Sequence, residues 1–129
     1  MRLFISSDIE GTTGIVHWDE TDYDRGGRWY DYFRERMTRE AAAACIGAKE
    51  GGAEYIRVKD AHDWARNIIP AELPEGVTIH RGWSGSPLSM VDGLDEGFDA
   101  LALTGYHSPG HGDGNPLAHT MTPAADEVT

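Results

Sequence analysis

Cysteines, basic side chains and long apolar runs are all scarce in this sequence of 129 residues. Cys45 is the single cysteine, which excludes both an intrachain disulfide and a cluster of thiolate metal ligands. No apolar run approaches the roughly 20 residues of a membrane-spanning helix, and the N-terminus lacks the pattern of a signal peptide. We therefore expect a cytoplasmic protein with no membrane partner.

The scarcity of basic residues also bears on partners. The 11 basic and 22 acidic side chains give a formal net charge of −11, which argues against nucleic acid as a partner. Apolar residues make up 40% and charged residues 26% of the chain, as in ordinary globular domains. The closing residues Glu127-Val128-Thr129 resemble the first half of a strand. We therefore expect residues 1–129 to be a single α/β domain and the N-terminal catalytic portion of a longer chain.

The sequence does contain a regular succession of short apolar strands. Strands are predicted at residues 2–8, 53–60, 76–82 and 99–107, and a short helix or turn at residues 88–97. Thr38 is predicted to cap a helix over residues 39–50, which Gly51-Gly52 ends. One face of that helix carries the small residues Ala41, Ala44, Cys45 and Ala48. Strand–helix–strand spacing of this length predicts an α/β fold with a largely parallel sheet and flanking helices.

Side chains able to bind a metal follow three of these strands. Asp8 and Glu10 follow the first strand, His62 the second and His107 the fourth. Because the carboxyl ends of parallel strands share one edge of a sheet, all four are expected at the same rim. Asp8 and Glu10 project from one face, where two like charges repel unless a cation lies between them. His119 follows a glycine-rich loop and can fold back over this rim.

Two carboxylates and two imidazoles suit Zn²⁺ or another first-row divalent ion. Four ligands exceed what one catalytic zinc usually takes, and a carboxylate that bridges two ions is the common alternative, for which Asp8 is well placed. Each residue also has an ordinary interpretation. Asp8 could be a turn or cap residue, His62 a surface or hydrogen-bonded histidine, and His107 a loop residue. The other three histidines are interpreted as structural, exposed or loop residues, namely His17, His80 and His111.

Four segments carry a resemblance to a known family. They are "SSDIEGTTGI", "MTREAAAACIGAKEGGAEYIRVKDAHDWARNI", "PLSMVDGLDEGFDALALTGYHSPG" and "LAHTM". Together they resemble the dinuclear zinc D-aminopeptidases of the DppA type over almost the whole chain. The resemblance implies that Asp8 bridges two zinc ions, that Glu10 and His62 complete the first site, and that His107 binds the second. It also implies that His119 is the catalytic histidine.

The resemblance further implies an activity and an assembly. The family hydrolyses short peptides with an N-terminal D-amino acid, with a metal-activated bridging water as the attacking group. The family forms a homo-oligomeric ring, which implies self-association here. In the family the second zinc takes a further glutamate from a segment after the catalytic histidine, and this sequence stops before that segment.

Some residues and functions keep more than one interpretation. Lys59 stands where the family usually has an uncharged side chain, so it either lies near the metals and weakens binding or points away. Asp60 either orients His62 or belongs to the turn after the strand. Two other functions fit the same residues, namely a two-metal phosphoesterase and an inactive metal-binding fragment that lacks the last ligand of the second zinc.

Overall fold

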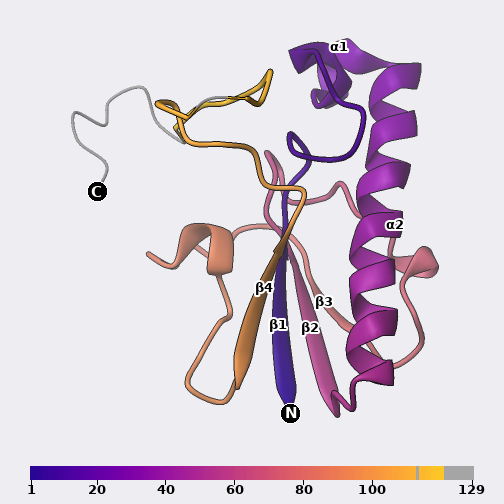
Figure 1. Cartoon of the computed structure of the whole chain (residues 1–129), viewed down its shortest axis with the longest axis vertical. Helices are drawn as coiled ribbons and strands as arrows, with labels where there is room; N and C mark the ends of the chain where they lie inside the picture. The colour runs from indigo at the N-terminus through magenta and orange to yellow at the C-terminus, as the bar shows by residue number, and fades with distance from the viewer. Residues whose placement is uncertain (113, 121–129) are drawn as a thin grey trace.

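A four-stranded sheet forms the centre of the fold in this computed structural model, which describes residues 1–112 and 114–120. The strands are β1 (Arg2–Ser7), β2 (Tyr55–Asp60), β3 (Thr78–His80) and β4 (Ala100–Thr104). They pair in the order β3-β2-β1-β4, and each pairing is parallel (Figure 1). The predicted α/β fold with a parallel sheet is confirmed, and the carboxyl ends of the strands share one edge.

Helix α2 (Arg28–Glu50) packs along one face of this sheet (Figure 1). Its buried side chains recur every three or four residues, which is the period of an amphipathic helix. They join side chains of β1 and β2 in one hydrophobic core, which includes Phe33, Met37, Ala41, Cys45, Leu3, Ile5, Ile56 and Val58. Full burial of one such large side chain contributes about 2 kcal/mol. The predicted small-residue stripe is confirmed, since Ala44 and Ala48 pack against the same core.

The predicted start of this helix was wrong, whereas its end is confirmed. The helix begins at Arg28, and Thr38 is buried inside it. The Thr38 hydroxyl donates to the Arg34 carbonyl at 2.8 Å and accepts from the Ile69 amide at 3.1 Å, so it is satisfied without ending the helix. At the other end the Gly51 amide donates to the Gly47 carbonyl at 2.9 Å.

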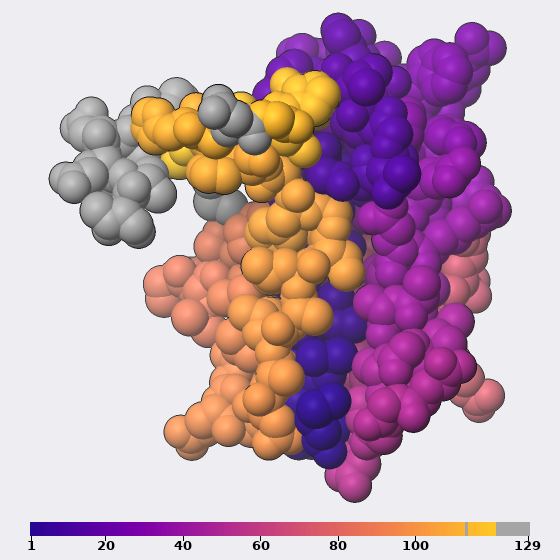
Figure 2. Space-filling model, viewed as in Figure 1, coloured from indigo at the N-terminus to yellow at the C-terminus, as the bar shows by residue number. Residues whose placement is uncertain are grey.

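The opposite face of the sheet is covered by the chain that leads from β3 to β4 (Figure 1). The Phe98 ring packs edge-on against the Phe4 ring with centroids 5.2 Å apart, and the Ser6 hydroxyl donates to the Met90 carbonyl at 2.5 Å. In the space-filling view β1 therefore shows only as a narrow strip between β4 and α2 (Figure 2). This central, buried strand is a rigid base for the residues that follow it.

Short elements complete the described chain. They are the 3₁₀ helices η1 (Trp18–Glu20), η2 (Pro70–Glu72) and η3 (Ser89–Val91), and the one-turn helix α1 (Tyr23–Gly26). Among the described residues no helix has both the length and the hydropathy needed to cross a bilayer. The strand expected from Glu127-Val128-Thr129 lies outside the described residues.

Candidate metal centre

Two glycines allow the turn after β1 to contact the chain after β4. A Cβ atom at Gly11 would lie 2.0 Å from the Tyr106 carbonyl oxygen, and one at Gly105 would lie 2.1 Å from the Asp8 carbonyl oxygen. Gly105 also has a φ of 65°, which side chains disfavour. The Gly11 amide donates to the Gly105 carbonyl at 2.8 Å. Because neither glycine has a side chain, the acidic turn is held directly against the residues that follow β4.

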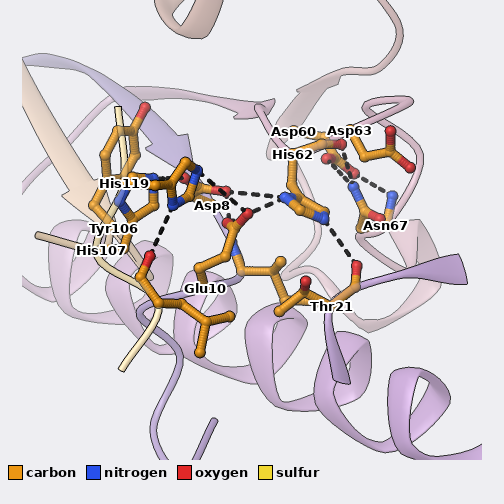
Figure 3. A network of polar contacts seen from close by, with 12 residues as sticks. Asp8, Glu10, Thr21, Asp60, His62, Asp63, Asn67, Tyr106, His107 and His119 are labelled. Carbon is orange, nitrogen blue, oxygen red and sulfur yellow. Dashed lines mark hydrogen bonds and ion pairs between the residues drawn. The ribbon is translucent and has the colours of Figure 1, made fainter. Parts of the chain in front are cut away.

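Asp8 and Glu10 lie between histidines on two sides (Figure 3). His62 Nδ1 is 3.3 Å from Asp8 Oδ1 and 3.1 Å from Glu10 Oε2. On the other side, His107 Nε2 is 3.7 Å from Asp8 Oδ2, and His119 Nε2 is 3.9 Å from Glu10 Oε1. One donor atom from each of Asp8, Glu10 and His107 lies within 4.8 Å of the other two. All five site residues predicted from the sequence therefore lie together.

Main-chain carbonyl groups hold one nitrogen of each of these three imidazole rings. The carbonyl groups belong to Thr21 for His62 Nε2 (2.8 Å), to Ser108 for His107 Nδ1 (2.8 Å) and to Leu117 for His119 Nδ1 (2.7 Å). A carbonyl oxygen only accepts hydrogen bonds, so each of these nitrogens carries a hydrogen. In the neutral ring the other nitrogen then directs a lone pair towards the two carboxylates. No sequence pattern signals these contacts, because any residue supplies a carbonyl oxygen.

The carboxylates are buried, with Asp8 only 2% and Glu10 only 6% exposed. Burial raises the pKa of Asp8 to about 6. Burial would also raise the pKa of Glu10, but hydrogen bonds with His62 and Asp8 outweigh it and lower that pKa to about 2. For His62 burial lowers the pKa, but hydrogen bonds to Asp8 and Glu10 outweigh it and raise the pKa to about 10. The carboxylates thus favour a positive charge at this place.

This set of donor atoms fits a divalent cation. Two carboxylates and three imidazole lone pairs that face one another repel unless a proton or a metal ion lies between them. The Oε2 atom of Glu10 is buried, and the nitrogen that faces it at 3.1 Å is His62 Nδ1. Carboxylate oxygens and imidazole nitrogens are typical ligands of Zn²⁺ and related ions. The residues present therefore match the chemistry of a zinc site.

A cavity of about 660 Å³ opens onto the centre. Its wall includes Trp18, Met90 and Tyr106. The His107 and His119 rings stack with centroids 3.6 Å apart, and the Trp18 ring packs edge-on against His119 at 4.9 Å. His119 therefore does fold back over the rim, and the cavity leaves room for a small organic substrate beside the metal-binding atoms.

Comparison with known proteins identifies the family. The model of peptidase family M55, described as D-aminopeptidase, matches residues 1–129. The chain belongs to this family. A D-aminopeptidase of Bacillus subtilis (strain 168) is 33% identical over 121 residues, which cover 94% of this chain and 43% of that protein. This chain therefore spans less than half the length of that relative.

A solved structure of this M55 family agrees with the fold. It is that of the zinc-dependent D-aminopeptidase DppA from Bacillus subtilis, described as a self-compartmentalizing protease. The two structures match with a TM-score of 0.86 at 30% sequence identity, over 95% of this chain and 43% of DppA. The α/β fold with its parallel sheet is thus shared with a zinc-dependent D-aminopeptidase.

Asp60 and Lys59 each had two interpretations, and their contacts favour one. The Asp60 carboxylate accepts hydrogen bonds from the Asn67 amide, the Asn67 side chain and the Ile68 amide at 2.6 to 2.9 Å, so it holds the turn after β2 instead of the His62 ring. Lys59 is fully buried, and its ammonium group donates to the Gly82 carbonyl at 2.5 Å. It also lies 4.1 Å from the centre of the Trp83 ring, and it is not part of the cavity wall.

The remaining histidines lie outside the centre, as predicted. His17 Nδ1 accepts from the Asp19 amide at 3.2 Å and caps η1. His80 Nε2 lies 3.6 Å from the Asp92 carboxylate. His111 is an exposed loop residue. None of the three lines the cavity at the metal centre.

Proposed function

We propose that this chain carries the metal centre of a zinc-dependent aminopeptidase that hydrolyses short peptides with an N-terminal D-amino acid. Membership of the D-aminopeptidase family supports the reaction class. The observation that carries the proposal is the convergence of two buried carboxylates and three histidine side chains beside a cavity.

Asp8, Glu10, His62 and His107 are the proposed metal ligands. The two oxygens of Asp8 face different histidines, with Oδ1 towards His62 and Oδ2 towards His107, which supports Asp8 as a bridge between two ions. Zinc bound there supplies Lewis acidity, which polarises a carbonyl group and makes water a nucleophile at neutral pH. Other first-row divalent ions accept the same donor atoms.

His119 is the proposed catalytic residue, which moves a proton or stabilises the developing oxyanion. Its Nδ1 hydrogen is held by the Leu117 carbonyl, so Nε2 is the atom available to exchange a proton on the Glu10 side of the ring. Packing between the rings of Trp18 and His107 fixes the plane of the imidazole. A side chain held in this way is suited to general acid–base catalysis, which is typically worth 10²–10⁴-fold in rate.

The charge of the cavity favours a peptide amine over a phosphate ester. Asp22, Asp24 and Asp63 line the wall in addition to the two carboxylates of the centre. Arg25 is the basic residue of that wall, and its Nε lies 3.4 Å from an oxygen of Asp22. A wall rich in carboxylates attracts the cationic amino end of a peptide and repels a phosphate dianion. This observation favours the aminopeptidase over the two-metal phosphoesterase.

The relative DppA is described as a self-compartmentalizing protease. We propose that the protein to which this chain belongs self-associates in a similar homo-oligomer. Because the chain spans 43% of its relatives, the activity is proposed for that protein as a whole. A metal-binding fragment without turnover is the alternative for residues 1–129 alone.

The test compares hydrolysis of D-alanyl-p-nitroanilide and p-nitrophenyl phosphate by zinc-loaded protein. We expect turnover of the anilide only. His119→Ala should keep its zinc, measured by elemental analysis, and lose about 10²–10⁴-fold in kcat. The exposed loop variant His111→Ala should leave both quantities unchanged. Turnover of the phosphate ester alone would contradict the proposal, as would full activity of His119→Ala, and zinc binding with no turnover would favour the inactive fragment.

A further inference from the structure

A second cavity, of about 490 Å³, lies beside the metal centre and has the opposite charge. Its wall contains three arginines and three aromatic residues, namely Arg34, Arg66, Arg81, Tyr23, Tyr30 and Trp64. Asp24 is the acidic residue of this wall. The chain as a whole has 11 basic side chains and a formal net charge of −11, so three arginines around one cavity are a marked local concentration of positive charge.

The three arginines come from separate parts of the chain. Arg34 lies on α2, Arg66 in the loop after β2, and Arg81 directly after β3. The fold therefore brings these charges together at one cavity, although they are distant in sequence. Because bringing like charges together costs energy, their convergence is favourable only when an anion or a solvent-exposed wall compensates it.

Contacts position two of the three guanidinium groups without neutralising them. Arg34 Nε donates to the Asn67 carbonyl at 2.8 Å, and its guanidinium lies 5.8 Å from the Tyr30 ring. The Arg66 guanidinium lies 5.9 Å from the Trp64 ring. Among the ion pairs of the described residues none involves Arg34, Arg66 or Arg81. These arginines therefore keep their charge available to a ligand.

The second cavity is a neighbour of the metal centre. Trp64 and Asp24 line both cavities. Asn67, which belongs to the second wall, lies beyond His62 on the side away from His107 and His119 (Figure 3). An extended ligand can therefore begin at the metal centre, pass Trp64 and end among the arginines.

We propose that the second cavity is a subsite for the C-terminal carboxylate of a short peptide whose amino end lies at the metal centre. The inference rests on the proposed aminopeptidase function. Planar guanidinium groups match the geometry of a carboxylate, and the aromatic wall covers the apolar part of the last residue. The acidic cavity receives the amine and the basic cavity receives the carboxylate, so the two charges of a short peptide select its direction and its length.

The test uses zinc-loaded protein with D-alanyl-glycyl-glycine and with the C-terminal amide of the same peptide. We expect kcat/KM about 10-fold higher for the acid, which corresponds to one charge-assisted contact. Arg66→Gln and Arg81→Gln are exposed substitutions, and each should lower that preference about 3-fold through KM. The double variant should treat acid and amide alike.

Arg28→Gln is the matched control. Arg28 is an exposed arginine of α2 that lines neither cavity, so its loss changes the net charge equally without touching the subsite. It should keep the full preference for the acid. If Arg28→Gln reduces the preference as much as Arg66→Gln does, the effect is one of overall charge and the subsite is refuted.

Calorimetry with triglycine and triglycinamide separates this inference from the proposed function, because it measures recognition without turnover. A preference for triglycine that the double variant loses supports the subsite, even if no D-peptide is hydrolysed; in that case only the proposed activity fails. Equal binding of acid and amide by the unmodified protein overturns the subsite, as does a preference that the double variant retains. Hydrolysis of D-peptides would then leave the proposed activity standing alone.

Discussion

Replacing Asp8 by asparagine is expected to stabilise the metal-free protein and to abolish its binding of zinc. Asp8 is almost fully buried, and burial raises the pKa of its carboxyl from 3.8 to about 6. Because the pKa of Asp8 in the folded protein lies above its ordinary value, ionisation of this buried carboxyl group destabilises the folded state. This destabilisation is absent below pH 3.8 and fully present above pH 6. At pH 7 the penalty is about 3 kcal/mol, since one pKa unit corresponds to about 1.4 kcal/mol.

The asparagine side chain fits the contacts that Asp8 makes. Asp8 Oδ1 accepts from the Ile9 amide at 2.8 Å, and the asparagine oxygen keeps this bond. The amide nitrogen takes the place of Oδ2, which lies 3.7 Å from the His107 nitrogen that carries a lone pair. Because the substitution removes a charge without creating a cavity, we expect a gain of about 1–3 kcal/mol in the free energy of unfolding.

Urea unfolding at pH 7, with a chelator or with zinc, measures both effects. Zinc at 100 times its Kd should stabilise the unmodified protein by about 2.7 kcal/mol and should not stabilise Asp8→Asn. Asp31→Asn, an exposed change in the first turn of α2, should alter neither value by more than about 0.5 kcal/mol. A metal-free Asp8→Asn protein that is less stable than the original, or one that zinc stabilises as strongly, would refute the reasoning.

Three further changes test other parts of the centre. Gly105→Ala places a Cβ atom 2.1 Å from the Asp8 carbonyl oxygen, so it should lower the free energy of unfolding by about 2–4 kcal/mol and weaken zinc binding. The control is Gly85→Ala, where φ is also positive, at 80°, but the added Cβ atom meets open space; thermal unfolding should show a loss of about 1 kcal/mol. Hydrogen bonds to the carboxylates outweigh burial and raise the pKa of His62 to about 10, above the ordinary 6.5. The stabilising effect of its charge is therefore full below pH 6.5 and lost as the pH rises through 10. Zinc binding at pH 7 should accordingly release a proton, which calorimetry in two buffers of different ionisation enthalpy detects; equal heats in both buffers would contradict this. Asn67→Ala removes a hydrogen-bond partner of the buried Asp60 carboxylate, so it should lower the free energy of unfolding in urea by about 2–4 kcal/mol. A loss below about 1 kcal/mol would show that this contact is unimportant.

The strand ends were the part of the fold and site that sequence could predict. A period of two and short apolar runs located β1, β2 and β4, and a parallel sheet must bring their carboxyl ends to one edge. Asp8, His62 and His107 were therefore predictable as neighbours. The return of His119 over the rim was predicted from the glycine-rich loop, whereas its stacking on the His107 ring was not.

Other features could not be predicted because their determinants are not local. Thr38 looked like a helix cap, yet tertiary packing of Tyr30, Phe33 and Met37 extends α2 back to Arg28. The turn after β2 has positive φ at Asp63 and Ala65, and no glycine marks it. The partner of His62 is a main-chain atom, which no residue type reveals.

The carbonyl groups that hold the three imidazole rings have a consequence for the evolution of the centre. A side-chain partner is lost by one substitution, whereas a main-chain oxygen at Thr21, Ser108 or Leu117 survives any replacement that leaves the backbone in place. The hydrogen bonds to the three rings therefore do not depend on the side chains at these positions, although packing constrains the buried side chains of Thr21 and Leu117. The orientation of the rings is therefore sensitive chiefly to insertions, deletions and prolines that shift the backbone at these carbonyl groups.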